Sequence, residues 1–250
     1  MKKVLKKLLA FIGIGIFKIP RRCQVWTNPP SDKKHIRVVP NATYAPWLND
    51  KDFMSVYSCV KEHTLVDIFR CYELWSLAQQ ACSVEGDIIE IGVWRGGSGA
   101  ILAKATENCK KSKKVFLADT FTGVVKAGLN DTKYKGGEHS NTSLEIVSNL
   151  INTLSLRNTE IIVGMFPEDS GQRVKGKISL LHCDVDVYQS CKDIIEWVTP
   201  RLSVGSILVF DDFGFSGCEG VATFCEELKS RSDLKFIHNL NGHAIYIKFK

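Results

Sequence analysis

The chain has 250 residues, 44% of them hydrophobic and 24% charged, and a formal net charge of +6. These values are those of an ordinary soluble globular protein, long enough to bury a full core, with no repeats or low-complexity tracts. Seven of the 33 basic residues, and no acidic residue, lie in residues 1–22, which leaves 26 bases against 27 acids elsewhere. The folded part therefore has no basic excess, and this balance disfavours a nucleic-acid partner.

Residues 1–22 form a leader in which lysines flank the apolar run Leu8–Phe17. The run is shorter than the roughly 20 residues that span a bilayer, and no small-residue cleavage site follows it, as a secretory signal would require. We expect an interfacial helix that makes peripheral contact with the inner face of a membrane. The alternative is a terminal helix that packs on the domain or on a partner.

The nine cysteines are scattered along the chain, odd in number and without CxxC spacing. This pattern predicts neither a disulfide framework nor a zinc site. Most of them have apolar neighbours, as small buried side chains do in a reducing cytoplasm. The sequence thus favours a cytoplasmic enzyme.

Residues 23–85 are predicted to form a linker followed by a helical cap. The segment 24–34 is rich in turn-forming residues. From Asp50 to Gln80 the apolar residues recur with helical spacing, and Asp50 is a suitable N-cap. Two helices should meet near His63 and Thr64.

Residues 86–250 alternate strands with helices. The predicted strands are 87–93, 113–121, 159–166, 177–188 and 205–214, the predicted helices are 98–109, 144–155, 191–202 and 218–231, and the chain closes as a hairpin of 234–240 and 243–249. Apolar strands separated by helices indicate an α/β fold with a parallel sheet covered on both faces. The terminal antiparallel hairpin favours the seven-stranded, Rossmann-like sheet of the Class I methyltransferases over a dinucleotide-binding fold, which ends in a parallel strand.

A glycine-rich turn follows the first predicted strand. The candidate cofactor-binding residues here are Glu90, Gly92, Trp94, Gly96, Gly97 and Ser98. Such a turn lets a ligand approach the backbone and the start of the next helix. Trp94 occupies the second glycine position of the dinucleotide fingerprint, so the motif favours S-adenosylmethionine over NAD. A tight turn with a purely structural role is the alternative.

Asp119 ends the second predicted strand, 27 residues after Gly92, where ribose-binding acids lie in these folds. Its carboxylate could accept both ribose hydroxyls, and the adjacent Thr120 joins it in the candidate cofactor site. The alternative is that Asp119 only caps the turn that follows.

Three aspartates are predicted where two neighbouring strands end: Asp184 at the end of the fourth strand, and Asp211 and Asp212 at the end of the fifth. The carboxyl ends of adjacent parallel strands meet at one edge of the sheet, so these side chains should converge. Carboxylates that lie close together either raise each other's pKa or share a cation. A ligand set made only of oxygens suits Mg²⁺. Asp186 is a candidate base or supporting residue.

The polar stretch 128–143 reads as a mobile lid that closes over the acceptor. His139 or Glu138 could reach the substrate from it, and His139 is the third candidate catalytic residue beside Asp184 and Asp186. A solvated loop residue is the alternative for His139. His182 is predicted to be a core histidine.

The chain resembles the macrocin O-methyltransferase family (the TylF/MycF group) from about Tyr44 to its C-terminus. The resemblance rests on "GDIIEIGVWRGGSGAIL", "ADTFTGV", "HCDVDVYQS", "PRLSVGSILVFDDFGFSGCEGV" and "NLNGHAIYI". It implies a sugar O-methyltransferase of the Class I fold that uses S-adenosylmethionine and Mg²⁺. It further implies that the glycine turn with Ser98 holds the methionine part of the donor, that Asp119 binds the ribose, and that Asp184, Asp211 and Asp212 bind the metal.

The acceptor is expected to be a small-molecule or lipid-linked sugar, with a glycosylated secondary metabolite as the alternative, and the protein is expected to be a homo-oligomer. Two other functions stay open at this point: an NAD-dependent oxidoreductase, and a non-catalytic nucleotide-binding protein tethered to a membrane. The broken dinucleotide fingerprint and the terminal hairpin argue against the first. The three confined aspartates argue against the second, because a scaffold does not need them.

Overall fold

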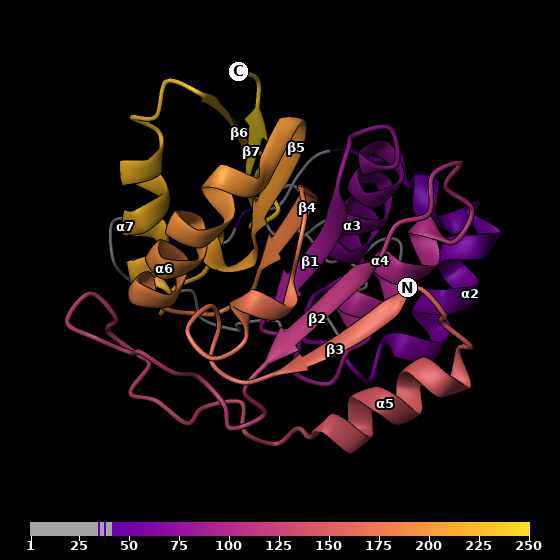
Figure 1. Ribbon diagram of the computed structural model, residues 1–250, viewed down its shortest axis with the longest axis horizontal. Coiled ribbons are helices and arrows are strands. Elements are labelled where there is room, and N and C mark those ends of the chain that lie inside the picture. Colours follow the sequence, from indigo (N-terminus) through magenta and orange to yellow (C-terminus); the bar gives the residue numbers. More distant parts are fainter. Residues whose placement is uncertain (1–34, 36–37, 39–41) are drawn as a thin grey trace, which may run out of the picture.

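The computed structural model describes His35, Val38 and residues 42–250. A seven-stranded sheet in the order β3-β2-β1-β4-β5-β7-β6 runs through the centre (Figure 1). Its strands are β1 (Asp87–Ile91), β2 (Val115–Asp119), β3 (Thr159–Val163), β4 (Ile178–Cys183), β5 (Leu202–Phe210), β6 (Leu234–His238) and β7 (Ala244–Lys248). Only β7 runs antiparallel to its neighbours, β5 and β6. This is the predicted Class I methyltransferase sheet with its terminal hairpin.

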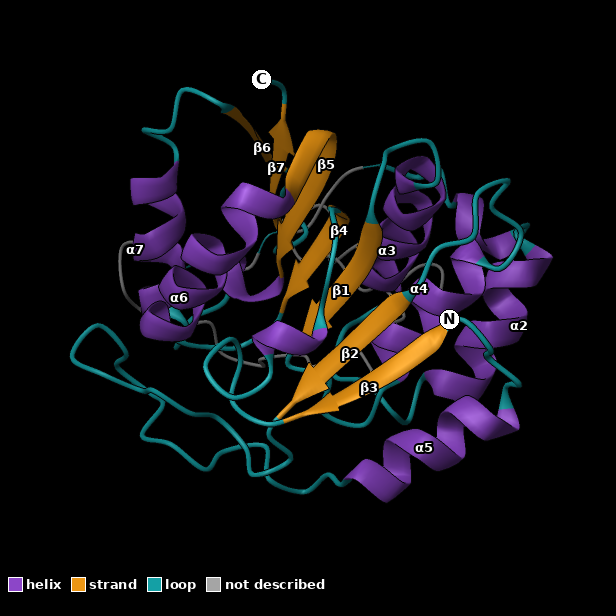
Figure 2. Cartoon of the chain, in the orientation of Figure 1, coloured by secondary structure: helices purple, strands orange, loops and turns teal. Residues whose placement is uncertain are grey.

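Helices cover both faces of the sheet (Figure 2). They are α2 (Lys51–Val60), α3 (Ile68–Ala81), α4 (Gly97–Thr106), α5 (Leu144–Thr153), α6 (Tyr188–Val198) and α7 (Glu219–Leu228). Alternate strand residues divide the core in two: Ile89 and Ile91 pack with α6 and α7, and Ile88 packs with α2, α3 and α4. The predicted cap helices therefore share a hydrophobic core with the sheet.

The predicted N-cap of the first long helix is confirmed, and the next helix is capped in the same way. The carboxylate of Asp50 accepts the backbone N–H of Phe53 at the start of α2, and Asp67 does the same for two N–H groups of α3. Among the described residues, no helix is both long enough and apolar enough to cross a membrane. The leader, residues 1–22, lies outside the described residues.

Two predicted boundaries shift in a way that matters for the site. The fourth strand ends at Cys183 rather than near Tyr188, because the chain turns sharply at Asp186, whose φ is 65°. Helix α6 consequently begins at Tyr188. The fifth strand ends at Phe210, and Asp211 opens a short 3₁₀ turn. Both aspartate-bearing segments thus leave the sheet at its carboxyl edge, where side chains can point into a cavity.

The expectation of cysteines without disulfides is wrong at one pair. Cys82, just after α3, and Cys109, three residues past α4, form a disulfide with a Cα–Cα distance of 5.5 Å. The two residues are 27 positions apart in sequence, and the packing of α3 against α4 brings the segments that follow their C-terminal ends together. Spacing alone could not reveal this. Of the other described cysteines, five are buried, as expected, and Cys59 is exposed.

Candidate active site

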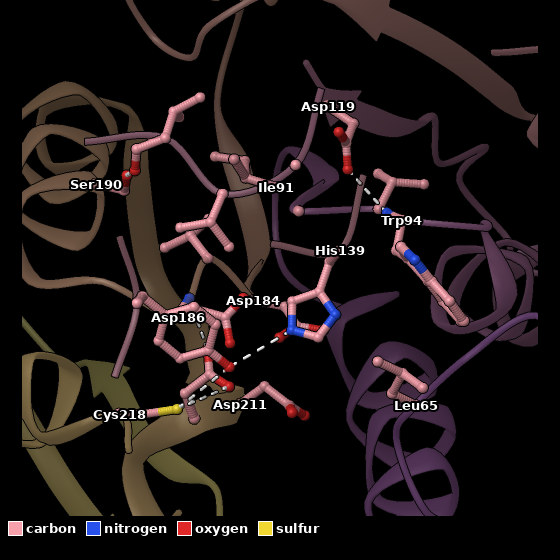
Figure 3. Close-up of a pocket in the computed structure, with 18 of the residues that line it drawn as sticks. Leu65, Ile91, Trp94, Asp119, His139, Asp184, Asp186, Ser190, Asp211 and Cys218 are labelled. Carbon is pink, nitrogen blue, oxygen red and sulfur yellow. Dashed lines mark hydrogen bonds between the residues drawn. The ribbon is translucent and has the colours of Figure 1, made fainter. Parts of the chain in front are cut away.

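A cavity of about 210 Å³ opens at the carboxyl ends of β1, β2, β4 and β5. Figure 3 shows its two ends: Asp119 and Trp94 lie at one, and a group of aspartates lies at the other, with His139 between them. The walls come from the turn before α3, the glycine turn, the loop between β2 and α5, and the segments that follow β4 and β5. One cavity therefore joins the two regions that the sequence singles out.

At the first end, Asp119 is held by the backbone. Its Oδ2 accepts the N–H of Trp94 at 2.8 Å, and its Oδ1 accepts the N–H of Phe121 at 2.6 Å. Burial raises the pKa of Asp119, and these backbone donors act in the opposite direction. Asp119 lines the cavity, and a carboxylate has about four lone-pair sites, so it can accept ribose hydroxyls as well as backbone N–H groups. This hydrogen-bond acceptor fits the nucleoside part of S-adenosylmethionine.

Contacts within the protein determine the conformation of the glycine turn. Trp94 adopts a φ of 48° at the fingerprint's second glycine position, and its indole Nε1 donates to Asn141 Oδ1 at 3.0 Å. A Cβ at Gly92 would lie 1.6 Å from the carbonyl oxygen of Asp184, and one at Gly97 would lie 2.6 Å from the carbonyl oxygen of His63. Close backbone crossings therefore require these two glycines.

The candidate cofactor residues divide into two groups. Those that line the cavity are Gly92, Trp94, Ser98, Asp119 and Thr120. Gly96 and Gly97 are buried under α5 and the turn before α3, outside the lining, where they let α4 start close to the cavity. Thr120 shapes the next turn by accepting the N–H of Thr122 at 3.1 Å.

Glu90 points away from the cavity, into the core beside α4. It is fully buried, and its Oε1 lies 2.8 Å from Nδ1 of His182, its register partner on β4. Burial by itself lowers the pKa of His182, but Asp211 and Glu90 outweigh it and raise that pKa to about 10. His182 is thus the predicted core histidine, and it is paired with acids on two sides.

At the second end, the predicted aspartates converge. One carboxylate oxygen from each of Asp184, Asp211 and Asp212 lies within 4.8 Å of the other two. Asp211 and Asp212 are buried, and Asp184 is half-buried against the cavity. Three oxygen donors at this spacing, with an open side toward the cavity, form a ligand set that fits Mg²⁺.

The pKa values of the three aspartates in the cluster are shifted in different directions. Burial and repulsion from neighbouring carboxylates hold the pKa values of Asp184 and Asp212 well above the ordinary range. Burial has the same effect on Asp211, but Arg70, His182 and His243 outweigh it and hold that pKa well below the ordinary value. A bound cation would favour the charged forms of Asp184 and Asp212, so the cluster is chemically suited to one.

Asp186 lies beside this cluster and belongs to a short polar chain. Its backbone N–H donates to Asp212 Oδ2 at 2.9 Å, and its carboxylate accepts a hydrogen bond from the Tyr134 hydroxyl. The same hydroxyl lies 3.5 Å from Nε2 of His139. Burial raises the pKa of Asp186. The positive φ of both Asp186 and His139 is an uncommon conformation of the kind that gathers at binding sites.

The loop between β2 and α5, predicted to be a mobile lid, is fastened at several points. Asp131 is buried and accepts the N–H of Gly128 at 2.8 Å and that of Tyr188, at the start of α6, at 3.0 Å. Near the loop's other end, the Thr142 hydroxyl donates to the carbonyl oxygen of Trp94. Glu138 accepts two N–H groups of the loop itself. A closing movement of the whole loop would have to break the bonds to Tyr188 and Trp94, which lie outside the loop.

Sequence reasoning missed several residues of the cavity. Arg70 and Leu65 enter it from the helical cap, Tyr134 from the loop, and Phe215 and Cys218 from the turn after β5. Of these residues, only Tyr134 could have been identified from the sequence, since it lies five residues before His139 in the polar stretch. Arg70 reaches the cavity because α3 packs against the end of β5, a contact that no local pattern predicts.

Comparison with known proteins identifies the family. The family model described as macrocin-O-methyltransferase (TylF) matches residues 57–248. This chain belongs to the macrocin-O-methyltransferase family. It is an S-adenosylmethionine-dependent O-methyltransferase, which excludes both the oxidoreductase and the non-catalytic alternative.

Two characterised relatives are similar to this O-methyltransferase over most of their length. The 8-demethyl-8-(2,3-dimethoxy-alpha-L-rhamnosyl)-tetracenomycin-C 4'-O-methyltransferase of Streptomyces olivaceus is 29% identical over 185 residues, which is 69% of each chain. The mycinamicin III 3''-O-methyltransferase of Micromonospora griseorubida is 27% identical over 171 residues, 62% of this chain and 67% of the relative.

Solved structures agree on the fold of the methyltransferase. The O-methyltransferase NovP superposes with a TM-score of 0.66 at 21% identity, covering 75% of this chain and 83% of NovP. The calicheamicin methyltransferase CalS11 gives a TM-score of 0.60 at 14% identity, over 87% of this chain and 99% of CalS11. At these identities the likeness supports the Class I fold alone.

Proposed function

We propose that this enzyme methylates a hydroxyl group of a sugar, with S-adenosylmethionine at the Asp119 end of the cavity and Mg²⁺ on Asp184, Asp211 and Asp212. The single observation that carries the proposal is that both sets of residues line one cavity. The rhamnosyl group named for the tetracenomycin relative supports a sugar as the acceptor.

The residues of this chain supply positioning and proton transfer. Bound Mg²⁺ would polarise an acceptor hydroxyl and lower its pKa, and bound S-adenosylmethionine would supply the methyl group. A carboxylate oxygen of Asp186 is placed to accept the proton of that hydroxyl, and Tyr134 orients this carboxylate through its hydrogen bond. Aligning the hydroxyl with the methyl group contributes much of the acceleration.

A transfer assay tests the acceptor class and the metal together. We expect radiolabelled methyl groups to pass from S-adenosylmethionine to rhamnosides or sugar nucleotides, and chelation by EDTA to stop the transfer until Mg²⁺ is restored. A catechol tested in parallel should stay unlabelled. Labelling of the catechol instead of the sugars would contradict the acceptor class, and undiminished transfer in EDTA would contradict the metal.

The leader suggests that the acceptor is a lipid-linked glycan. A cytoplasmic enzyme bound at the inner membrane face would then methylate it. Residues 1–22 combine seven positive charges with the apolar run Leu8–Phe17. We expect the full chain to sediment with vesicles that contain anionic lipid, and a chain lacking residues 1–22 to stay in the supernatant. Equal sedimentation of the two would rule out the leader as an anchor. Assembly as a homo-oligomer stays a prediction.

A further inference from the structure

The turn of the C-terminal hairpin lies directly beside the carboxylate cluster. Phe210 pairs with Ala244 across the antiparallel β5–β7 ladder, so the residue after β5 faces the residue before β7. These two are Asp211 and His243, and His243 Nε2 lies 2.8 Å from Asp211 Oδ1. His243 is completely buried. The hairpin that distinguishes this fold therefore places an imidazole against one candidate metal ligand.

The other ring nitrogen of His243 is held from α3. Its Nδ1 contacts Oε2 of Glu73, whose carboxylate also accepts hydrogen bonds from the amides of Asn239 and Asn241 in the hairpin turn. Glu73 does not line the cavity. It fixes the turn and the imidazole together, and it reaches Asp211 through the imidazole of His243.

Helix α3 also holds the second oxygen of Asp211. Arg70, one helical turn before Glu73, contacts Asp211 Oδ2 through Nη1 and donates from Nε to Asp67 Oδ2 at 2.8 Å. Its guanidinium stacks 4.4 Å above the ring of Phe215. Arg70 therefore acts on Asp211 directly, whereas Glu73 acts through His243, and the carboxylate is held at both oxygens.

We infer that Glu73 and His243 are positioning residues that orient Asp211 toward the divalent cation. This inference rests on the proposed Mg²⁺ dependence. Mg²⁺ requires near-octahedral geometry, so a ligand carboxylate that can rotate binds it more weakly than one held in place. Hydrogen-bond partners of metal ligands typically change metal affinity or activity by about 10- to 100-fold when they are removed.

Binding of Mn²⁺, followed by electron paramagnetic resonance in the presence of S-adenosylhomocysteine, measures this role without turnover. We expect Glu73→Ala to weaken Mn²⁺ binding by about 10-fold. Glu73→Gln keeps one oxygen that can still contact Nδ1 of His243, and it should restore most of the affinity. The dissociation constant of S-adenosylmethionine should stay unchanged in both variants, which excludes general damage to the cavity.

Asp233→Ala is the matched control. Glu73 contacts the turn of the β6–β7 hairpin, whereas Asp233 provides a carboxylate at the other end of that hairpin. Asp233 is as exposed as Glu73, 21% against 22%, and pairs with Arg231 and Lys248. The variant should bind Mn²⁺ like the wild type. Equal affinity of Glu73→Ala and wild type, or equal loss in both alanine variants, would overturn the positioning role while leaving Mg²⁺ dependence intact. Absence of Mn²⁺ binding by the wild type would overturn both.

Discussion

Replacing Asp212 by asparagine is expected to reduce turnover by at least ~100-fold while leaving the affinity for S-adenosylmethionine within about twofold. The lost ligand charge should cost several kcal/mol of transition-state stabilisation, and each ~1.4 kcal/mol is a factor of ten in rate. The asparagine oxygen can still accept the N–H of Asp186, now 2.9 Å from Asp212 Oδ2, so the local backbone should persist. Steady-state kinetics at saturating acceptor, with calorimetry for the donor, measure both quantities.

Asp212 is a better target than its neighbour Asp211. Arg70 and His243 both contact Asp211, and an asparagine there would take from the buried guanidinium one of its two carboxylate partners, leaving only Asp67. We expect Asp211→Asn to lower the unfolding temperature as well as turnover, whereas Asp212→Asn should lower turnover alone. Wild-type turnover in Asp212→Asn would remove this residue from the metal site, and a matching loss of donor affinity would assign it to the donor.

Replacing Asp186 by asparagine is expected to lower kcat by about 10²- to 10⁴-fold, the usual contribution of a general base. Asparagine adopts positive φ more readily than most residues, so it should tolerate the φ of 65° at this position. It retains the hydrogen-bonding shape of the side chain but cannot take up the proton of the acceptor. Single-turnover measurements with bound donor isolate this step from product release.

The affinities for Mn²⁺ and for the methyl donor distinguish a role of Asp186 as a base from a role in metal binding. We expect Asp186→Asn to bind both Mn²⁺ and the donor like the wild type, in contrast to Asp212→Asn. Asp193→Asn on α6, outside the cavity lining, controls for the loss of a nearby charge and should keep full activity. Unchanged kcat in Asp186→Asn would assign the base to another group, and His139 would be the next to test.

The sequence predicts the α/β sheet and the meeting of Asp184, Asp211 and Asp212, because chain topology decides both. In a doubly wound sheet the ends of adjacent parallel strands share one edge, so residues at those ends converge whatever their side chains do. The terminal hairpin is equally visible in the pattern of apolar strands around Asn241 and Gly242. These features need only periodicity and chain order.

What surrounds the aspartates could not be predicted, because it depends on packing between distant elements. Arg70 and Asp211 are 141 positions apart, and Glu73 and His243 are 170 apart. Glu90, by contrast, is easily recognised in the sequence but does not line the cavity. It occupies the acidic position of the glycine motif, yet it points into the core toward His182, since side chains alternate between the two faces of a strand.

Anomalous diffraction from crystals grown with Mn²⁺ and S-adenosylhomocysteine tests the proposed metal and donor sites most directly. We expect one anomalous peak within bonding distance of carboxylate oxygens from Asp184, Asp211 and Asp212, and ribose hydroxyls on Asp119 in the same cavity. A peak at another place, or a ribose bound away from Asp119, would contradict the proposal.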